Sequence, residues 1–302
     1  FADSSQIPTH LVSRMAREHV TVALSGDGGD ELFGGYERYR RINQIDRLRN
    51  ILPSAVVRQI GRGLRSIPIS RWDSLTKGAI GHLVPTSFRH RTGHRMHKAA
   101  EVLMASTSED IYRVLMSLNN GSDRLVLGTQ DLARPVQVDH SGSELVSFTP
   151  MERGMLIDTQ NYLPDDLLTK VDRASMAVSL EVRAPFLDPA LFRFAWGLPI
   201  DYRMQSGQGK WIIRQLLRRS LPDHLIDRPK IGFGVPISEW LRGPLESWAN
   251  DLLDPSLVAS QGFLDPELVA QYWANHRAKS GDFTYHLWAL LMFQAWLVES
   301  GL

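Results

Sequence analysis

The 302-residue sequence contains no cysteine. This absence excludes disulfides, cysteine-ligated zinc, iron–sulfur clusters and a thiol nucleophile. It also fits a reducing compartment, and we therefore expect a cytoplasmic protein. Long hydrophobic runs are missing too, because the longest apolar stretch, residues 287–298, contains Gln294 and is too short to cross a bilayer. We expect no membrane partner.

Acidic residues are scarce in one part of the chain. The whole sequence is balanced, with 34 Lys and Arg against 33 Asp and Glu. Between Arg38 and Lys98, however, there are 14 basic residues and only two acidic ones, Asp46 and Asp73. Such a segment can bind nucleic acid, form a solvated helical face or dock on an acidic partner domain. No nucleic-acid-binding motif accompanies it, so we expect no nucleic-acid partner.

Strand patterns are rare, and the clearest is the β-branched apolar run Val20–Leu24, which predicts a buried strand. Apolar residues at helical spacing precede it from Pro8 to Glu18. Asp30 and Glu31 follow it, where carboxylates would stabilise a helix N-terminus. The order helix, strand, helix predicts an α/β unit.

Beyond Ile42 the pattern is helical. We expect breaks at Pro53, Pro68, Pro85 and Gly93, a loose connection over 119–142, and helices over 164–180, 211–221 and 283–299. The last of these helices is apolar on nearly all sides, and we therefore expect it to be buried.

The turn after the predicted strand is rich in glycine and in carboxylates. Five glycines lie between Gly26 and Tyr36, and glycines at the end of a strand let backbone N–H groups approach a ligand. Asp27, Asp30 and Glu31 stand in the same turn. Carboxylates beside a phosphate require a cation between them, and Mg²⁺ is commonly held in this way. The alternative is a tight turn followed by a capped helix.

Two other segments concentrate charged residues. In the first, Asp166, Lys170 and Arg173 fall on one helix face, which is typical of a surface ion-pair ladder. In the second, residues 228–236, prolines and glycines surround Lys230. A lysine on such a rigid loop is suited to bind phosphate, although a lone loop lysine is usually solvated.

A third candidate site is the series His90, His94 and His97, whose spacing would allow zinc binding from one helix face. Gly93 interrupts this helix, and neighbouring arginines crowd it with positive charge. These features argue against a metal site.

Three segments together resemble one family. They are SGDGGDELFGGY at 25–36, LPDDLLTKVDRASMAVSLEVRAPFLD at 163–188 and RPKIGFGVPISEWL at 228–241. In this order they resemble the synthetase domain of the glutamine-hydrolysing asparagine synthetases. The likeness is greatest to an amidotransferase-like branch whose members often occur in surface-polysaccharide gene clusters.

The resemblance implies an α/β fold of the ATP-pyrophosphatase type, adenine nucleotide α-hydrolase-like, here incomplete and predominantly helical. Residues 1–40 would end the nucleotide-binding α/β part, and residues 41–302 would continue the same domain as helices. The implied activity is that of an asparagine synthase or a close relative, a carbon–nitrogen ligase of asparagine biosynthesis. With ATP and Mg²⁺ it would adenylate a small-molecule carboxylate, aspartate or an analogue. Pyrophosphate would leave, and ammonia from glutamine would form the amide.

The resemblance also implies which residues form the site. They are Ser25, Gly26 and Gly28 for ATP, Asp30 for Mg²⁺, Asp27 and Lys230 for catalysis, and Glu181 and Arg183 for the acceptor side. These roles suit the chemistry, since adenylation needs positive charge where negative charge develops. Amide formation needs a base for the proton of the incoming nitrogen.

The sequence departs from the family pattern in several places. Asp27 stands where asparagine synthetases proper carry Glu, and Gly29 stands in place of Ser, so the acceptor need not be free aspartate. The family's pyrophosphate loop, Ser-Gly-Gly-x-Asp-Ser, is absent, as is a glutaminase domain with its cysteine. We therefore expect a C-terminal portion that is inactive alone and is joined to an N-terminal glutaminase domain in the full-length protein.

Three questions stay open at this stage. A homodimer is compatible with the sequence. A non-catalytic nucleotide-binding or scaffold module of the same fold is one alternative function. An intramolecular amide-forming cyclase, as in β-lactam synthetases, is another, although Tyr at position 27 would favour it and Asp stands there.

Overall fold

The computed structural model divides into two compact units. It describes residues 1–69, 71–72, 74, 92–118, 125–128, 148–228, 234–280 and 283–301. One of the two compact units, here called the turn unit, comprises Asp3–Gln44 and the described residues of Pro135–Val235. The second, here called the helical unit, comprises Phe1–Ala2 and the described residues of Ile45–Arg134 and Pro236–Leu302.

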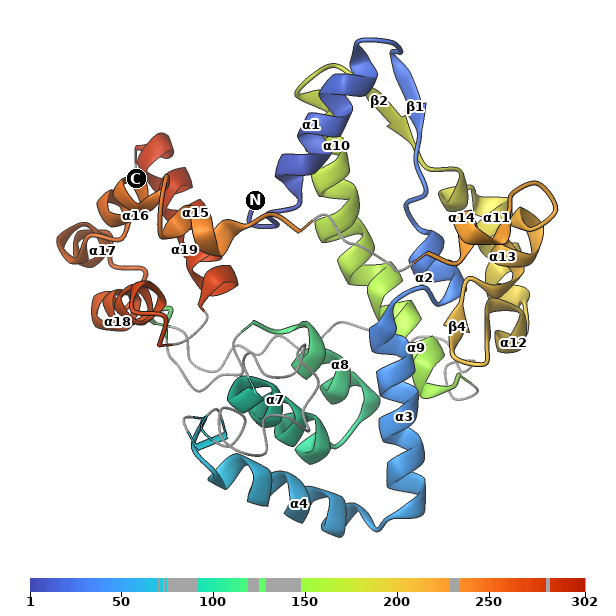
Figure 1. The fold of residues 1–302 in the computed structure, drawn as a ribbon, viewed down its shortest axis with the longest axis horizontal. Helices are drawn as coiled ribbons and strands as arrows, with labels where there is room; N and C mark the ends of the chain where they lie inside the picture. Colours follow the sequence, from blue (N-terminus) through green and yellow to red (C-terminus); the bar gives the residue numbers. More distant parts are fainter. Residues whose placement is uncertain are drawn as a thin grey trace. The chain divides into compact units, whose positions relative to one another are not determined.

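The turn unit contains a two-stranded parallel sheet (Figure 1). Strand β1 (Val22–Leu24) pairs with β2 (Glu181–Arg183), with Val22 opposite Glu181 and Leu24 opposite Arg183. Helix α1 (Gln6–Arg17) precedes β1 and packs on α10 (Thr169–Met176), which precedes β2. Helix α2 (Gly29–Phe33) follows β1, so the predicted order helix, strand, helix is confirmed.

The prediction of a buried strand over Val20–Leu24 is wrong in two respects. The strand covers only its last three residues, and Val22 and Leu24 are 39% and 75% exposed. Within the described residues β1 has a neighbouring strand on one side only. Parallel strands elsewhere are usually covered on both faces, so β1 presents an apolar surface that the sequence alone does not reveal.

One helical stretch leads from α9 to α10 through a π-helix. Helix α9 (Pro150–Ile157) begins at Thr149, whose side chain forms a capping box with Glu152. The π-helix η3 (Asp158–Leu168) follows and joins directly to α10. The predicted helix over 164–180 is therefore wrong at both ends, because the helical stretch begins at Pro150 and ends at Met176.

Pro164 lies inside η3 rather than at a helix start. Proline cannot donate the backbone hydrogen bond of a helix interior, and π-helical turns are one way in which a chain accommodates such a disruption. The hydroxyl of Thr169 donates to the Pro164 carbonyl at 2.9 Å. After α10 the chain turns through Ser179, which has a positive φ of 58°, and enters β2.

The remainder of the turn unit consists of short elements around the glycine-rich turn. They are α2 (Gly29–Phe33), the start of α3 (Glu37–Ile51), η4 (Pro185–Leu187), α11 (Pro189–Gly197), α12 (Ile200–Arg203), β3 (Met204–Gln205), β4 (Gln208–Gly209), α13 (Trp211–Leu217) and α14 (Asp223–Ile226). Strands β3 and β4 form an antiparallel hairpin. Leu32 and Phe33 of α2 are buried against Ala195 of α11, which fixes the turn on the core.

The helical unit confirms the expectation of helices beyond residue 42. Its elements are α4 (Ser54–Ser66), α7 (Thr92–Met104), α8 (Ser108–Met116), α15 (Ile237–Leu241), α16 (Glu246–Leu252), α17 (Pro255–Gln261), α18 (Pro266–Arg277) and α19 (Thr284–Ser300). Pro53 and Pro68 flank α4 as expected, whereas Gly93 lies within the first turn of α7, and Pro85 is outside the described residues. Among the described residues after 42, strands occur only as β2, β3 and β4.

Helix α19 is buried along one side only. Leu287, Leu291 and Leu297 are almost inaccessible, but Trp296 is about half exposed at 53%. The prediction that this helix is buried is therefore confirmed for one side and wrong for the other. No helix in the described part of the chain is long and apolar enough to cross a membrane.

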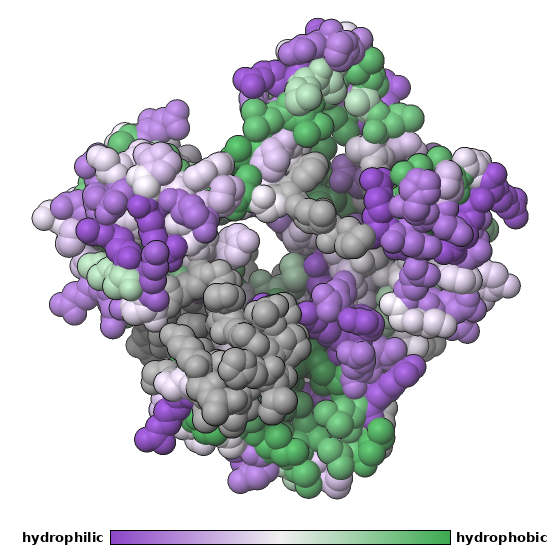
Figure 2. All heavy atoms as spheres, viewed as in Figure 1, coloured by the Kyte–Doolittle hydropathy of each residue, from purple (hydrophilic) through white to green (hydrophobic). Residues whose placement is uncertain are grey.

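The basic segment makes internal contacts in part. Arg65 pairs with Glu101, and Arg49 donates to the backbone carbonyls of Val102 and Ala105. Aliphatic side chains are exposed on the same helices, α3 and α4, and they contribute to the green area at the lower edge of Figure 2. They are Leu48, Ile51, Val56 and Ile60.

Candidate functional site

The glycine-rich turn begins where β1 ends. The backbone N–H of Ser25 donates to the Arg183 carbonyl at 2.8 Å, so the sheet extends by one residue into the turn. Gly28 has φ 86°, and a Cβ there would lie 2.5 Å from Leu187 Cδ2. Gly26 is different, because a Cβ there would meet no atom within 4 Å. The turn is therefore packed against η4 at Gly28 and open at Gly26.

Helix α2 carries two of the three carboxylates of the turn. The Asp30 carboxylate is partly accessible, and its Oδ2 lies 3.1 Å from Lys210 Nζ. Lys210 comes from the connection between β4 and α13, and its own N–H donates to the Phe33 carbonyl at 2.7 Å. Sequence reasoning missed Lys210, because nothing in the local pattern indicates that this lysine returns to the turn.

Glu31 is enclosed rather than available to a ligand. It is fully buried, and the Tyr36 hydroxyl donates to its Oε1 at 2.7 Å. Its Oε2 has no hydrogen-bond partner within the described residues. Burial raises the pKa of Glu31 more than the Tyr36 hydrogen bond lowers it. Glu31 is thus enclosed, whereas the Asp30 carboxylate is partly accessible.

Behind Glu31 lies a buried ion pair surrounded by tyrosines. Arg38 Nε donates to Asp158 Oδ2 at 2.8 Å, and Asp158 is fully buried. The Arg38 guanidinium lies 3.7 Å from the centre of the Tyr36 ring and 4.9 Å from that of Tyr162. The contact with Tyr162 joins the start of α3 to the π-helix η3. Sequence reasoning did not identify this pair, which joins residues that are far apart in the chain.

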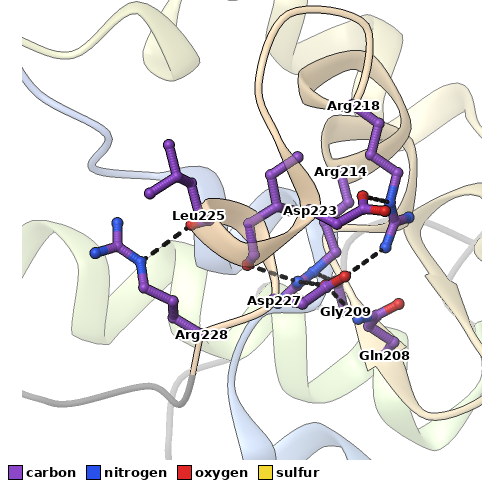
Figure 3. A network of polar contacts seen from close by, with 9 residues as sticks. Gln208, Gly209, Arg214, Arg218, Asp223, Leu225, Asp227 and Arg228 are labelled. Carbon is purple, nitrogen blue, oxygen red and sulfur yellow. Dashed lines mark hydrogen bonds and ion pairs between the residues drawn. The ribbon is translucent and has the colours of Figure 1, made fainter.

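An ion-pair network anchors the chain just before Lys230 (Figure 3). Asp227 accepts hydrogen bonds from Arg214 and Arg218, each at 2.9 Å. Arg218 also donates to Asp223 at 3.0 Å, and Arg214 donates to the Gly209 carbonyl at 3.2 Å. The network thus links the start of the 228–236 segment to the end of β4, directly beside Lys210.

Comparison with known proteins identifies the family. The sequence model of the family named asparagine synthase matches residues 1–298. The chain belongs to the asparagine synthase family.

The relatives found by sequence agree with this membership. A putative glutamine-hydrolysing asparagine synthetase of Mycobacterium tuberculosis is 33% identical over 303 residues, covering 98% of this chain and 42% of the relative. The glutamine-hydrolysing asparagine synthetase 1 of Bacillus subtilis is 28% identical over 296 residues, covering 98% and 43%. An amidase of Penicillium rubens is 22% identical over 276 residues, covering 84% and 38%. The chain thus spans less than half the length of these relatives.

The segment 163–188, which supports the likeness to the asparagine synthase family, holds a buried lysine. Lys170 Nζ contacts Asp3 Oδ2 and Ser5 Oγ, both at 2.8 Å. Although burial raises the pKa of Asp3, hydrogen bonds from Lys170 and Ser5 hold it below its ordinary value. Burial, followed by the charge of Asp3, raises the pKa of Asp166. The predicted surface ladder of Asp166, Lys170 and Arg173 is therefore wrong, because Lys170 binds the start of α1.

The residues that the family likeness implies for the acceptor side lie on β2. Glu181 and Arg183 pair with each other at 2.8 Å, and both side chains are more than half exposed. The two residues are two positions apart and therefore lie on the same face of β2. In the parallel sheet Glu181 pairs with Val22 and Arg183 pairs with Leu24. Their role toward a substrate stays a prediction.

Lys230 lies outside the described residues, as do His90 and the His94 side chain of the histidine series. From their roles toward ATP and Mg²⁺ we expect Asp30 and Lys230 to face a common cavity, and this stays a prediction. His97 Nε2 lies 2.8 Å from the Ile67 carbonyl oxygen. In the described part of the chain, no group of three or more His, Asp or Glu could hold a metal ion. A magnesium ion at Asp30 would thus need ligands from elsewhere, such as the phosphates of ATP.

Proposed function

We propose that this chain forms part of an ATP-dependent amide-forming ligase of the asparagine synthase type. A substrate carboxylate oxygen attacks the α-phosphorus of ATP, and pyrophosphate leaves. Ammonia released from glutamine then attacks the acyl-adenylate, AMP leaves, and an amide forms. The observation that supports this best is the glycine-rich turn at the end of β1, open at Gly26, with the accessible carboxylate of Asp30 beside Lys210.

The residues of the turn suit the first step. The backbone at Gly26 and Gly28 and the Ser25 hydroxyl would contact the nucleotide, because glycine leaves the backbone uncovered. The Ser25 N–H is already bonded to the Arg183 carbonyl. Asp30 would hold Mg²⁺ together with the phosphates, and Lys230 would balance charge on the α-phosphate and on pyrophosphate. Asp27 would accept the proton of the incoming nitrogen.

The acceptor is a small carboxylate, aspartate or an analogue, bound near Glu181 and Arg183. The arginine of this pair supplies a planar donor suited to a carboxylate, and the pair is accessible on β2. Ammonia would come from an N-terminal glutaminase domain of the full-length protein, since the names of the relatives specify glutamine hydrolysis. Asp27 and Gly29 differ from the residues of asparagine synthetases proper, so experiment must identify the acceptor.

The test uses the full-length protein with Mg²⁺, ATP and ammonium chloride in place of glutamine. A panel of small carboxylates, aspartate included, is screened for pyrophosphate release and for amide formation by mass spectrometry. Asp30→Asn should lower acceptor-dependent release by about a hundredfold or more, because it removes charge from the cation site. Asp201→Asn, an exposed carboxylate of α12, is the matched control and should change nothing.

Two results would contradict the proposal. One is hydrolysis of ATP to ADP and phosphate without AMP. The other is a full-length protein that forms no amide and leaves ATP intact with every acceptor. The 302 residues alone should release no pyrophosphate even with ammonia, because the sequence has no Ser-Gly-Gly-x-Asp-Ser loop to orient the phosphates.

A further inference from the structure

Lys210 is built into the glycine-rich turn by contact between two backbones. Gly209 lies against Gly34, and a Cβ at Gly209 would overlap the Gly34 carbonyl. The N–H of Lys210 donates to the Phe33 carbonyl at 2.7 Å. Only glycine at position 209 allows this approach, so the end of the β3–β4 hairpin is pressed onto the residues that follow α2.

The ion pair between Asp30 and Lys210 fills the space that a second glycine leaves. A Cβ at Gly35 would overlap Asp30 Oδ1 and would lie 2.6 Å from Lys210 Cε. The backbone of Lys210 has a positive φ of 58°, a conformation that residues other than glycine, asparagine and aspartate rarely adopt. A lysine in this position is unfavourable for the backbone, and such residues concentrate at functional sites.

The lysine of this pair is more accessible than Lys170, which pairs with Asp3. The side chain of Lys210 is 33% exposed and that of Lys170 is 9% exposed, whereas the two carboxylates, Asp30 and Asp3, are similar at 23% and 25%. Lys210 Nζ also lies 3.8 Å from the position of a Cβ at Gly29, directly over the turn. A ligand at the turn can therefore reach the ammonium group of Lys210 without unfolding its surroundings.

We propose that Lys210 is an anion-binding residue of the nucleotide site, which holds the Asp30 carboxylate in place and contributes positive charge to the polyphosphate of ATP. This rests on the proposed function of the turn. A lysine binds phosphate as a point charge, and here it stands beside the carboxylate that would share the cation. It competes with a free divalent cation for Asp30 and attracts the anionic nucleotide.

The charge of Lys210 should weaken the binding of a free cation at Asp30 and strengthen the binding of the nucleotide. A purely structural role would not change these two affinities in opposite directions. Replacing Lys210 by Met or Gln removes the charge but keeps most of the side-chain volume. A free divalent cation should then bind Asp30 more tightly, by about fivefold, since a repelling charge a few ångströms away has gone. The nucleotide should bind about tenfold more weakly for the converse reason.

The experiment measures both affinities in the full-length protein. Manganese(II) chloride alone is titrated by the electron paramagnetic resonance signal of the free ion. α,β-Methylene-ATP, from which pyrophosphate cannot leave, is titrated by calorimetry with Mg²⁺ present. Lys170→Met, which breaks the ion pair between the buried Lys170 and Asp3, is the matched control. It should lower the melting temperature without separating the two affinities.

Opposite changes in the two affinities in Lys210→Met and Lys210→Gln support the proposal. Parallel weakening of both affinities, or no change in either beside a lower melting temperature, would overturn it and leave Lys210 as a structural link. If the wild-type protein binds neither manganese nor the nucleotide analogue, the proposed function of the turn fails as well. If the wild-type protein binds both ligands and the variants bind them with unchanged affinities, the role of Lys210 is rejected, but the proposed function of the turn is not.

Discussion

Arg38 Nε donates to the fully buried carboxylate of Asp158 at 2.8 Å, across 120 positions of sequence. The pair connects the residues after the glycine-rich turn to the first residue of the π-helix η3. A buried ion pair need not add net stability, but the removal of one partner leaves the other charge in a poorly solvating environment. The loss of either partner should therefore destabilise the turn unit.

Arg38→Met should lower the free energy of unfolding by about 3–5 kcal/mol, because it takes the cation from a buried carboxylate. Arg40→Met is the matched control, since Arg40 pairs with Glu37 and both side chains are about half exposed. Such surface pairs contribute only about 0–1 kcal/mol. Urea unfolding of the two variants checks the difference, and equal stabilities would show that Asp158 does not depend on Arg38.

The pH dependence of stability should reveal Glu31. Burial raises the pKa of Glu31 above its ordinary value of 4.5, so the stability that its protonated form contributes is fully present below that value. It is lost as the pH rises through the folded-state pKa. Glu31→Gln keeps an oxygen acceptor for Tyr36 without a charge. Its stability relative to wild type should therefore increase with pH, by about 1.4 kcal/mol for each unit of the shift.

Glu37 provides the control with the opposite sign. The hydrogen bond from Arg41 lowers the pKa of this exposed carboxylate, so its stabilising contribution is present at higher pH and is lost on acidification. Glu37→Gln should lose a little stability relative to wild type as the pH rises. Urea unfolding between about pH 3 and pH 8 measures both trends, with the Glu37 effect at the acidic end. A flat difference for Glu31→Gln would mean that the Glu31 carboxyl is solvated.

The contact between Gly209 and Gly34 should not tolerate a side chain. Gly209→Ala places a Cβ over the Gly34 carbonyl, so the backbone must shift, and we expect a loss of about 1–3 kcal/mol. Gly197→Ala is the matched control, because a Cβ there meets nothing within 4 Å, and it should be neutral or stabilising by up to about 1 kcal/mol. Thermal unfolding measures both variants. Equal melting temperatures would contradict the close approach of the hairpin to the turn.

The sequence by itself determined the local elements and the family. The apolar run Val20–Leu24, the glycines that follow it and the helical spacing beyond Ile42 indicate their structures without any partner, since propensity and turn chemistry act over a few residues. The three family-like segments were readable for the same reason. The family model confirms that likeness.

Only the tertiary structure decided which distant residues meet. It placed β2 beside β1, Lys210 beside Asp30, and Lys170 beside Asp3 rather than in a surface ladder. It also showed that Leu24 is exposed, although the residue looks like part of a buried strand. Periodicity tells which side of an element is apolar, but not what covers that side. Burial and ion pairing depend on the path of the chain between the elements, and local sequence does not encode that path.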